Sequence, residues 1–319
     1  MLRVHRLIDK QWHTEEGIAA ASQAAQELDS TPVWVEATAP DPDECAALYR
    51  CFGIRERTLE DALEPQHPPV FREFDEHIFL IVHAPETSAR EETRKIALFL
   101  GHRWLLTVVR APLPMLEPLR EQLLRHAIYY LDAPDLLAHA ILDHMAQIFE
   151  ERVDEMIDLA DVLSERALEE PSPDVLPEIQ HLRRRTSAFT RIVRTQRDVY
   201  QSLARGGCPF LTRRVEPHLR DIADHMLRVY DLLEAVRDGI VAARDSYLTA
   251  VNYELNETMR KLTSIATILL PLGLVAGVFG MNFEWMPLIH RPFGFPIAIG
   301  GMITLALGLY AWLRSRRWL

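Results

Sequence analysis

The sequence predicts an α/β domain followed by a long helical stalk and two C-terminal transmembrane helices. Three observations predict this class. Strand-like and helix-like runs alternate over residues 1–134, and helical periodicity then continues to residue 281. Two long apolar stretches lie near the end of the chain. We expect these parts, in chain order: an α/β domain over 1–134, a helical hairpin over 135–206, a stalk helix over 213–261, a first transmembrane helix over 262–281, a loop over 282–292, a second transmembrane helix over 293–313 and a basic tail over 314–319.

Four runs in the first domain are rich in Val, Ile, Leu and aromatic residues, as buried strands are. They are residues 33–38, 77–83, 95–100 and 104–109. Residues 15–28, 41–52 and 113–127 are expected to be helices, and "PDPDE" supplies an acidic helix start for the second of them. The alternation predicts an α/β or α+β domain.

After this domain, two apolar stripes with helical spacing are ended by "EEPSPD" and "GGCP", which predicts a helical hairpin. A third helix is expected to begin near Pro217, because proline is favoured in the first turn. As one helix, residues 216–281 would extend about 100 Å at 1.5 Å per residue. Such a stalk would connect the body to the membrane segment.

The two apolar stretches, 262–281 and 293–313, contain no charged residue. Each matches the roughly 20 residues that cross a bilayer as a helix, and Trp285 and Trp312 lie near the expected interfaces. Basic residues precede the first stretch and follow the second, whereas the loop between the two stretches offers only Arg291. This bias places both termini in the cytoplasm and the loop outside.

Charge and cysteine content limit the kinds of partner that the cytoplasmic body can have. The 319-residue chain has a net charge of −11, and because its tail carries +3, residues 1–261 carry −14. This acidity argues against nucleic acid and anionic lipid and favours cations. The three scattered cysteines form neither a disulfide framework nor a metal-binding pair, and the N-terminal sequence has no signal-peptide core.

One face of the first apolar helix carries small and apolar residues at steps of three and four. These residues are Met259, Thr263, Ala266, Leu270, Gly273 and Gly277. Two helices cannot enclose a water-filled path, so a conducting protein would have to be an oligomer, with this face as its lining. The alternative is simple helix packing, because "GLVAG" is also a G-x-x-x-G pattern.

Acidic residues on the body are individually ordinary helix charges. No calcium loop, H-E-x-x-H helix, phosphate-binding loop, dinucleotide glycine loop or nucleophile–base set stands out, so the sequence does not predict an enzyme.

The membrane end nevertheless resembles the CorA family of divalent-cation channels and transporters. The residues that carry the resemblance are Gly280-Met281-Asn282 at the end of the first span, then "FEWMP", "FGFP" and the terminal "RRWL". Residues 59–82 also resemble the family's E-D…H-x-P-x-x-x-x-F turn and strand. The similarity runs from about residue 55 to the end of the chain.

The resemblance implies a funnel-shaped homopentamer in a cell inner membrane, with five copies of the first span lining a pore. Gly280, Met281 and Asn282 would form the selectivity filter, with Glu284 attracting cations to its mouth. The implied pore-lining residues are Asn256, Met259, Leu270, Gly273 and Gly277. The function implied is passive Mg²⁺ influx, with Co²⁺ and Ni²⁺ also carried and no cofactor required. Regulatory Mg²⁺ would bind between cytoplasmic domains, and its implied ligands are Asp61, Asp221, Glu60 and Asp143.

Three departures leave the preferred ion open. Phe279 replaces the usual tyrosine before the GMN motif, Leu288 replaces a loop glutamate, and Gly273 stands where a hydroxyl-bearing residue is common. A Zn²⁺ transporter of the same family therefore stands as an alternative to a Mg²⁺ channel. An alternative of another class is a membrane-anchored cation sensor or scaffold, whose acidic body binds partners and whose two helices only anchor it.

Overall fold

The computed structural model describes residues 1–8, 11–28, 31–85, 93–125, 133–281, 292–316 and 318. The chain forms two compact units. The first contains Met1–Ser164 and Leu176–Ala243, and the second contains Glu165–Val175 and Arg244–Leu319. The sheet and most of the helices therefore belong to the first unit, and the two apolar segments belong to the second.

The first unit is built on a seven-stranded sheet with the order β2-β1-β3-β7-β6-β5-β4. Only the β3–β7 pair is parallel among the described strand pairs. The strands are β1 (Leu2–Ile8), β2 (Gln11–Glu16), β3 (Val33–Thr38), β4 (Val70–Glu73), β5 (Ile78–Pro85), β6 (Thr93–Leu100) and β7 (Trp104–Val109).

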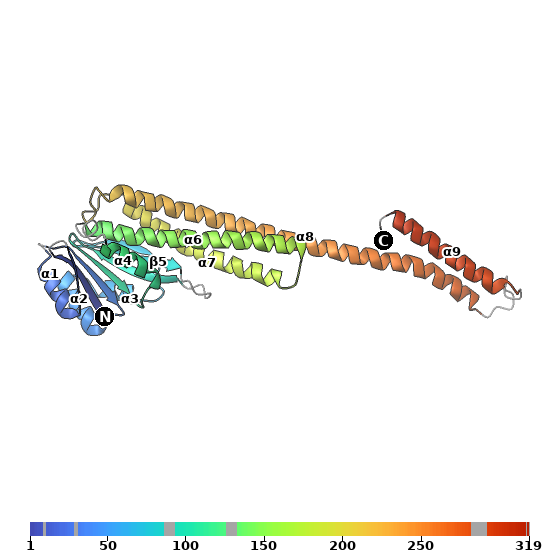
Figure 1. Ribbon diagram of the computed structural model, residues 1–319, viewed down its shortest axis with the longest axis horizontal. Helices are drawn as coiled ribbons and strands as arrows, with labels where there is room; N and C mark the ends of the chain where they lie inside the picture. Colours follow the sequence, from blue (N-terminus) through green and yellow to red (C-terminus); the bar gives the residue numbers. More distant parts are fainter. Residues whose placement is uncertain are drawn as a thin grey trace. The chain divides into compact units, whose positions relative to one another are not determined.

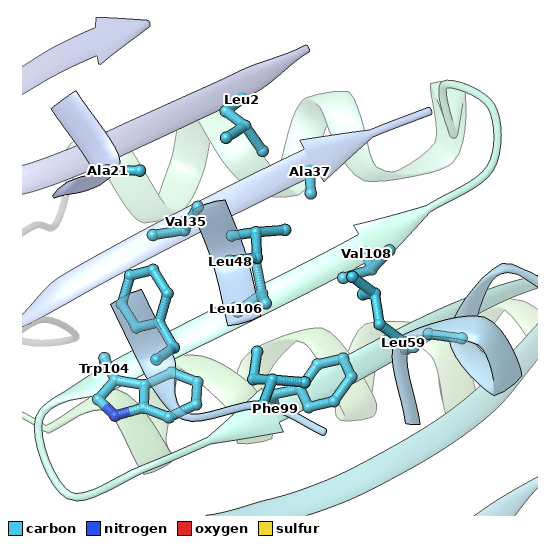
Figure 2. Close-up of a cluster of buried hydrophobic side chains, with 14 of the residues drawn as sticks. Leu2, Ala21, Val35, Ala37, Leu48, Leu59, Phe99, Trp104, Leu106 and Val108 are labelled. Atoms are coloured by element: carbon cyan, nitrogen blue, oxygen red, sulfur yellow. The ribbon is translucent and has the colours of Figure 1, made fainter. Parts of the chain in front are cut away.

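Three short helices cover one face of this sheet: α1 (Ile18–Gln26), α2 (Pro42–Phe52) and α3 (Glu56–Leu63). Figure 2 shows the core that they close, in which Leu48 from α2 and Leu59 from α3 lie against Val35, Phe99 and Leu106 of the strands. Helix α2 begins where the acidic sequence predicts, because Asp41 and Glu44 form a reciprocal capping box.

The other helices follow the last strand along the chain, and in the first unit α6, α7 and the start of α8 lie side by side (Figure 1). The remaining elements are η1 (Pro114–Leu116), α4 (Glu117–Arg125), α6 (Pro134–Glu169), α7 (Val175–Ala204), α8 (Glu216–Phe279) and α9 (Gly294–Ser315).

Buried polar side chains connect α7 to the sheet and to α6. Gln196 on α7 accepts a hydrogen bond from the His83 backbone N–H at 2.7 Å and donates one to the His83 carbonyl at 3.2 Å. Tyr200, one turn farther along α7, donates to the Leu142 carbonyl of α6. Both side chains are buried, and full hydrogen bonding makes their burial tolerable.

Helices α6 and α8 approach closely within the first unit. A Cβ atom added to Gly239 of α8 would lie 3.2 Å from the Cβ of Ala160 on α6. His225 of α8 also pairs with Glu150 of α6, Nε2 to Oε2 at 2.6 Å. Small residues at this crossing allow the backbones to approach closely.

The predicted α/β body, long helix and two C-terminal apolar helices are confirmed. β3 and β7 have the predicted bounds, and α8 covers 216–279 of the expected 216–281. Strands β1, β2 and β4 and helix α3 were missed, and the helix expected over 15–28 is wrong at its start. Residues 11–16 instead pair with β1, and Gly17, at φ 95°, separates that strand from α1.

Candidate functional site

The two apolar segments of α8 and α9 are long and apolar enough to cross a membrane. Only 6% of the residues in the most apolar stretch of each helix are buried. The core helix of a soluble protein would be mostly buried, so this low value excludes that explanation for both helices within the chain itself. Their apolar surface is available to lipid or to other copies of the chain.

The five expected pore-lining residues share one face of α8. With 3.6 residues per turn, the positions of Asn256, Met259, Leu270, Gly273 and Gly277 fall within an arc of about 100°. Leu270 is 72% exposed and Met259 is 59% exposed. A Cβ atom added to Gly273 or Gly277 would meet no atom within 4 Å. This face is therefore open along its length in the single chain.

The helix ends in a tight turn at the expected filter. The Gly280 N–H donates to the carbonyls of Ala276 and Gly277 at 3.0 and 3.2 Å, and the Met281 N–H donates to that of Val278. A Cβ at position 280 would lie 3.3 Å from the Ala276 carbonyl oxygen, and Gly280 does not have a positive φ. Asn282 and Glu284 lie outside the described residues.

The C-terminal tail binds within the second unit. The Ser264 hydroxyl of α8 donates to the Trp318 carbonyl at 3.3 Å, and the Trp318 N–H donates to the Leu313 carbonyl at 3.1 Å. Ser264 and Leu313 are buried, unlike most residues around them. These contacts hold the end of α9 near residue 264 of α8.

Asp61, an expected regulatory ligand, lies on α3 and already has cationic neighbours. The Arg72 guanidinium lies 2.7 Å from its carboxylate, and the His67 ring nitrogen lies 3.8 Å away. Lys95 donates to the Asp61 carbonyl at 2.7 Å, and burial lowers the pKa of this lysine to about 8. Glu60 is exposed on the same helix. A metal ion at Asp61 would therefore have to compete with Arg72.

Asp143 and Asp221 lie on different helices, α6 and α8, beside a pair of histidines. The rings of His139 and His218 are 5.2 Å apart between their centroids. Both carboxylates lie close enough to act electrostatically on the His139 ring. Asp143 also accepts a hydrogen bond from Gln147 at 2.8 Å.

The sequence family described as CorA-like Mg²⁺ transporter protein matches residues 29–317. The chain belongs to the CorA family. The resemblance carried by the GMN motif is thus confirmed, and members of this family are transporters and channels, not enzymes. The chain is accordingly a member of a divalent-cation transporter family with two C-terminal apolar helices.

Individual relatives are similar to this chain over most of its length. The cobalt/magnesium transport protein CorA of Thermotoga maritima is 28% identical, covering 91% of this chain and 84% of the relative. The putative metal ion transporter YfjQ of Bacillus subtilis is 26% identical, covering 89% of each. The complete CorA structure from Methanocaldococcus jannaschii has the same fold, with a TM-score of 0.83 at 20% identity over 100% of this chain and 99% of that one.

Within this CorA fold, only some expected ligands come together in one chain. Asp143 and Asp221 share the neighbourhood of His139, whereas no hydrogen bond or ion pair of the described residues joins them to Asp61 or Glu60. No three His, Cys, Asp or Glu side chains in the described parts are already drawn together as a metal site. Sequence reasoning missed Arg72 and the two histidines, because their partners are distant in sequence.

Proposed function

We propose that the chain forms a homopentameric channel that conducts Mg²⁺ passively into the cell and also carries Co²⁺ and Ni²⁺. The observation that carries the proposal is the open face of α8, where five expected pore residues are exposed and two of them are glycines. One chain cannot bury this face, so copies must surround the path. Membrane potential would drive entry, since moving a +2 ion inward is worth about 4.6 kcal/mol per 100 mV.

The proposed selectivity filter is Gly280-Met281-Asn282, with Asn282 facing the ion. Mg²⁺ loses its water reluctantly, so selection is easier when the hydration shell stays in place. Carboxamide oxygens accept hydrogen bonds from those waters without the strong attraction of a carboxylate. Glu284 would raise the cation concentration at the outer mouth, and it acts alone there because Leu288 replaces a second acid.

Farther along the pore, Leu270 and Met259 are the proposed hydrophobic constrictions, and such rings close a pore by excluding water. Gly273 and Gly277 would leave room for a hydrated ion on the outer side of Leu270, and Asn256 would line the inner end. The open face supports this arrangement, because Leu270 and Met259 are largely exposed and a Cβ added at Gly273 or Gly277 would meet no atom within 4 Å.

Regulation is proposed to act through Mg²⁺ bound between cytoplasmic domains. Asp61 of one subunit would face Asp221 of the next, with Glu60 and Asp143 contributing nearby. A bound cation offsets carboxylate repulsion and favours the closed state, so a fall in internal Mg²⁺ opens the pore. Arg72 would compete with Mg²⁺ for Asp61, because Mg²⁺ must displace the guanidinium from the carboxylate.

We also propose an inner-membrane location with both termini in the cytoplasm. The support is the excess of basic residues just before the first span and just after the second, compared with the loop between them. In this orientation the acidic body would sense internal cations, and the loop over 282–292 would face the outside.

The decisive experiment is Mg²⁺ flux into proteoliposomes under an inside-negative potential. We expect uptake by the wild-type chain and loss of ion selectivity in Asn282→Ala with the oligomer intact, as judged by size-exclusion chromatography. Absence of any flux would favour the sensor or scaffold alternative. Adding competing Zn²⁺, Co²⁺ and Ni²⁺ would separate the Mg²⁺ channel from the Zn²⁺ transporter, and unchanged selectivity in the variant would refute the role of Asn282.

A further inference from the structure

Two histidines face each other across the α6–α8 contact of the first unit. His139 lies on α6 and His218 on α8, with ring centroids 5.2 Å apart and ring planes inclined at 54°. Each has a carboxylate one turn along its own helix. Asp143 follows His139 by four residues and Asp221 follows His218 by three, so each lies on the same helix face as its histidine.

The ring separation suits joint binding of one metal ion. Two imidazoles on a tetrahedral metal, each with a metal–nitrogen bond of about 2.0–2.1 Å, have ring centres about 5 Å apart. The pair in this chain already lies at that separation. Two carboxylates close enough to act electrostatically on His139 would supply a third ligand and negative charge after side-chain rotation.

The two rings differ in exposure. His139 is partly buried, and this burial lowers its pKa. His218 is exposed, so an ion can reach the pair from solvent.

We infer that His139 and His218 form a binding site for a transition-metal cation such as Co²⁺, Ni²⁺ or Zn²⁺, completed by Asp143 or Asp221. Imidazole nitrogen suits these ions, whereas Mg²⁺ prefers oxygen ligands and retains its water. The site therefore differs in chemistry from the all-oxygen Mg²⁺ bridge proposed above. It shares two carboxylates with that bridge, so a transition metal would engage the same part of the molecule.

The consequence for regulation rests on the proposed function. If closure depends on a cation near Asp221, a transition metal held by the histidines would close the channel at a lower concentration than Mg²⁺ does. The channel would then limit its own uptake of Co²⁺ and Ni²⁺ before these ions accumulate. Metal binding by itself does not depend on transport and can be measured separately.

The test is titration of the purified full-length chain in detergent with Co²⁺ alone, followed by the visible absorption of the bound ion. Nitrogen ligands and a coordination number below six give Co²⁺ a much stronger band than the hydrated ion has. We expect such a band in the wild type and at least about tenfold weaker binding in His139→Gln and in His218→Gln, because even outer-shell changes cost 10- to 100-fold. His13→Gln, at an exposed histidine of β2, is the matched control and should bind like the wild type.

The outcomes separate this inference from the proposed function. Wild-type Co²⁺ affinity and absorption in both histidine variants would overturn the inference, even if Mg²⁺ flux and closure were normal. Histidine-dependent Co²⁺ binding by a protein that passes no Mg²⁺ would sustain the site and refute the channel. Thermal unfolding of each variant checks folding, and the exposed His218 provides a variant whose loss of binding does not depend on core packing.

Discussion

Helix α8 carries two kinds of apolar surface. Between Glu216 and Ala243 most of its apolar residues are buried within the first unit, and Met226 and Val229 are fully covered. In the second unit the apolar residues of the same helix are mostly exposed, with Leu274 at 70% and Leu270 at 72%. Charged residues occupy the other side of the first segment but are absent from residues 262–281.

This difference shows that one continuous helix can have one segment suited to a protein core and another suited to a lipid bilayer. The first segment is amphipathic, and the chain itself supplies the partners of its apolar face. The second segment is apolar all round and finds few partners in the chain, so lipid and neighbouring copies must supply them. Substitutions of one type, made once in each segment, should therefore act on stability in the first and on transport in the second.

The largest effect is expected from a polar residue on the buried face. Val229→Asn should destabilise the first unit by about 4 kcal/mol, because it removes a buried apolar side chain and buries an amide without partners. Leu270→Asn should leave unfolding unchanged and alter the Mg²⁺ flux, because Leu270 is exposed in the chain. Denaturant unfolding followed by circular dichroism checks both variants. Equal destabilisation of the two would contradict the comparison.

The glycines offer a second matched pair. Gly239→Val should destabilise the first unit by about 1–3 kcal/mol, because even its Cβ would lie 3.2 Å from Ala160. Gly273→Val meets no atom of the chain, so we expect normal unfolding with reduced flux through the narrowed pore. Thermal unfolding and proteoliposome uptake report the two effects. Unimpaired flux through Gly273→Val would argue against its place in the lining.

A smaller effect is expected at the proposed regulatory Mg²⁺ site of the first unit. Asp221→Ala should raise the internal Mg²⁺ needed for half-closure on the order of tenfold, because one charged ligand is lost. Uptake into proteoliposomes loaded with graded internal Mg²⁺ measures this value. The control is Asp224→Ala, another exposed acid one turn along α8. Intact inhibition in Asp221→Ala would rule out the bridging site.

The smallest effect concerns the ion pair that competes for Asp61. Arg72→Gln should lower the Mg²⁺ needed for half-closure by less than about fivefold, because partly exposed ion pairs contribute 0.2–1 kcal/mol. Arg57→Gln, an exposed arginine of α3, is the control. The same flux assay applies. A higher Mg²⁺ requirement in Arg72→Gln would show that the arginine supports closure instead of opposing it.

Local sequence patterns predicted the elements that are surrounded by apolar residues along most of their length. Most residues of strands β3 and β7 are buried, so their apolar runs identify them without knowledge of their neighbours. Strand β1 was missed because polar residues interrupt it. In the structure, His5 pairs with Glu36 on β3 and Arg6 pairs with Glu15 on β2. Such cross-strand partners become visible only when the sheet has formed.

The same limit applies to the candidate site. The open face of α8 follows from steps of three and four, which are local to one helix. Arg72 meets Asp61 across the contact between α3 and β4, and His139 meets His218 across two helices, so no spacing rule connects them.

The pair of hydrogen bonds between Gln196 and His83 has one more consequence. Strand β4 pairs with β5 only as far as Ile81, so the peptide groups of His83 on that side have no strand beside them. The carboxamide of Gln196 supplies one acceptor and one donor there, as the peptide group of another strand would. This side chain therefore imitates one unit of an extra strand and satisfies both peptide groups of a buried residue where β5 extends beyond β4.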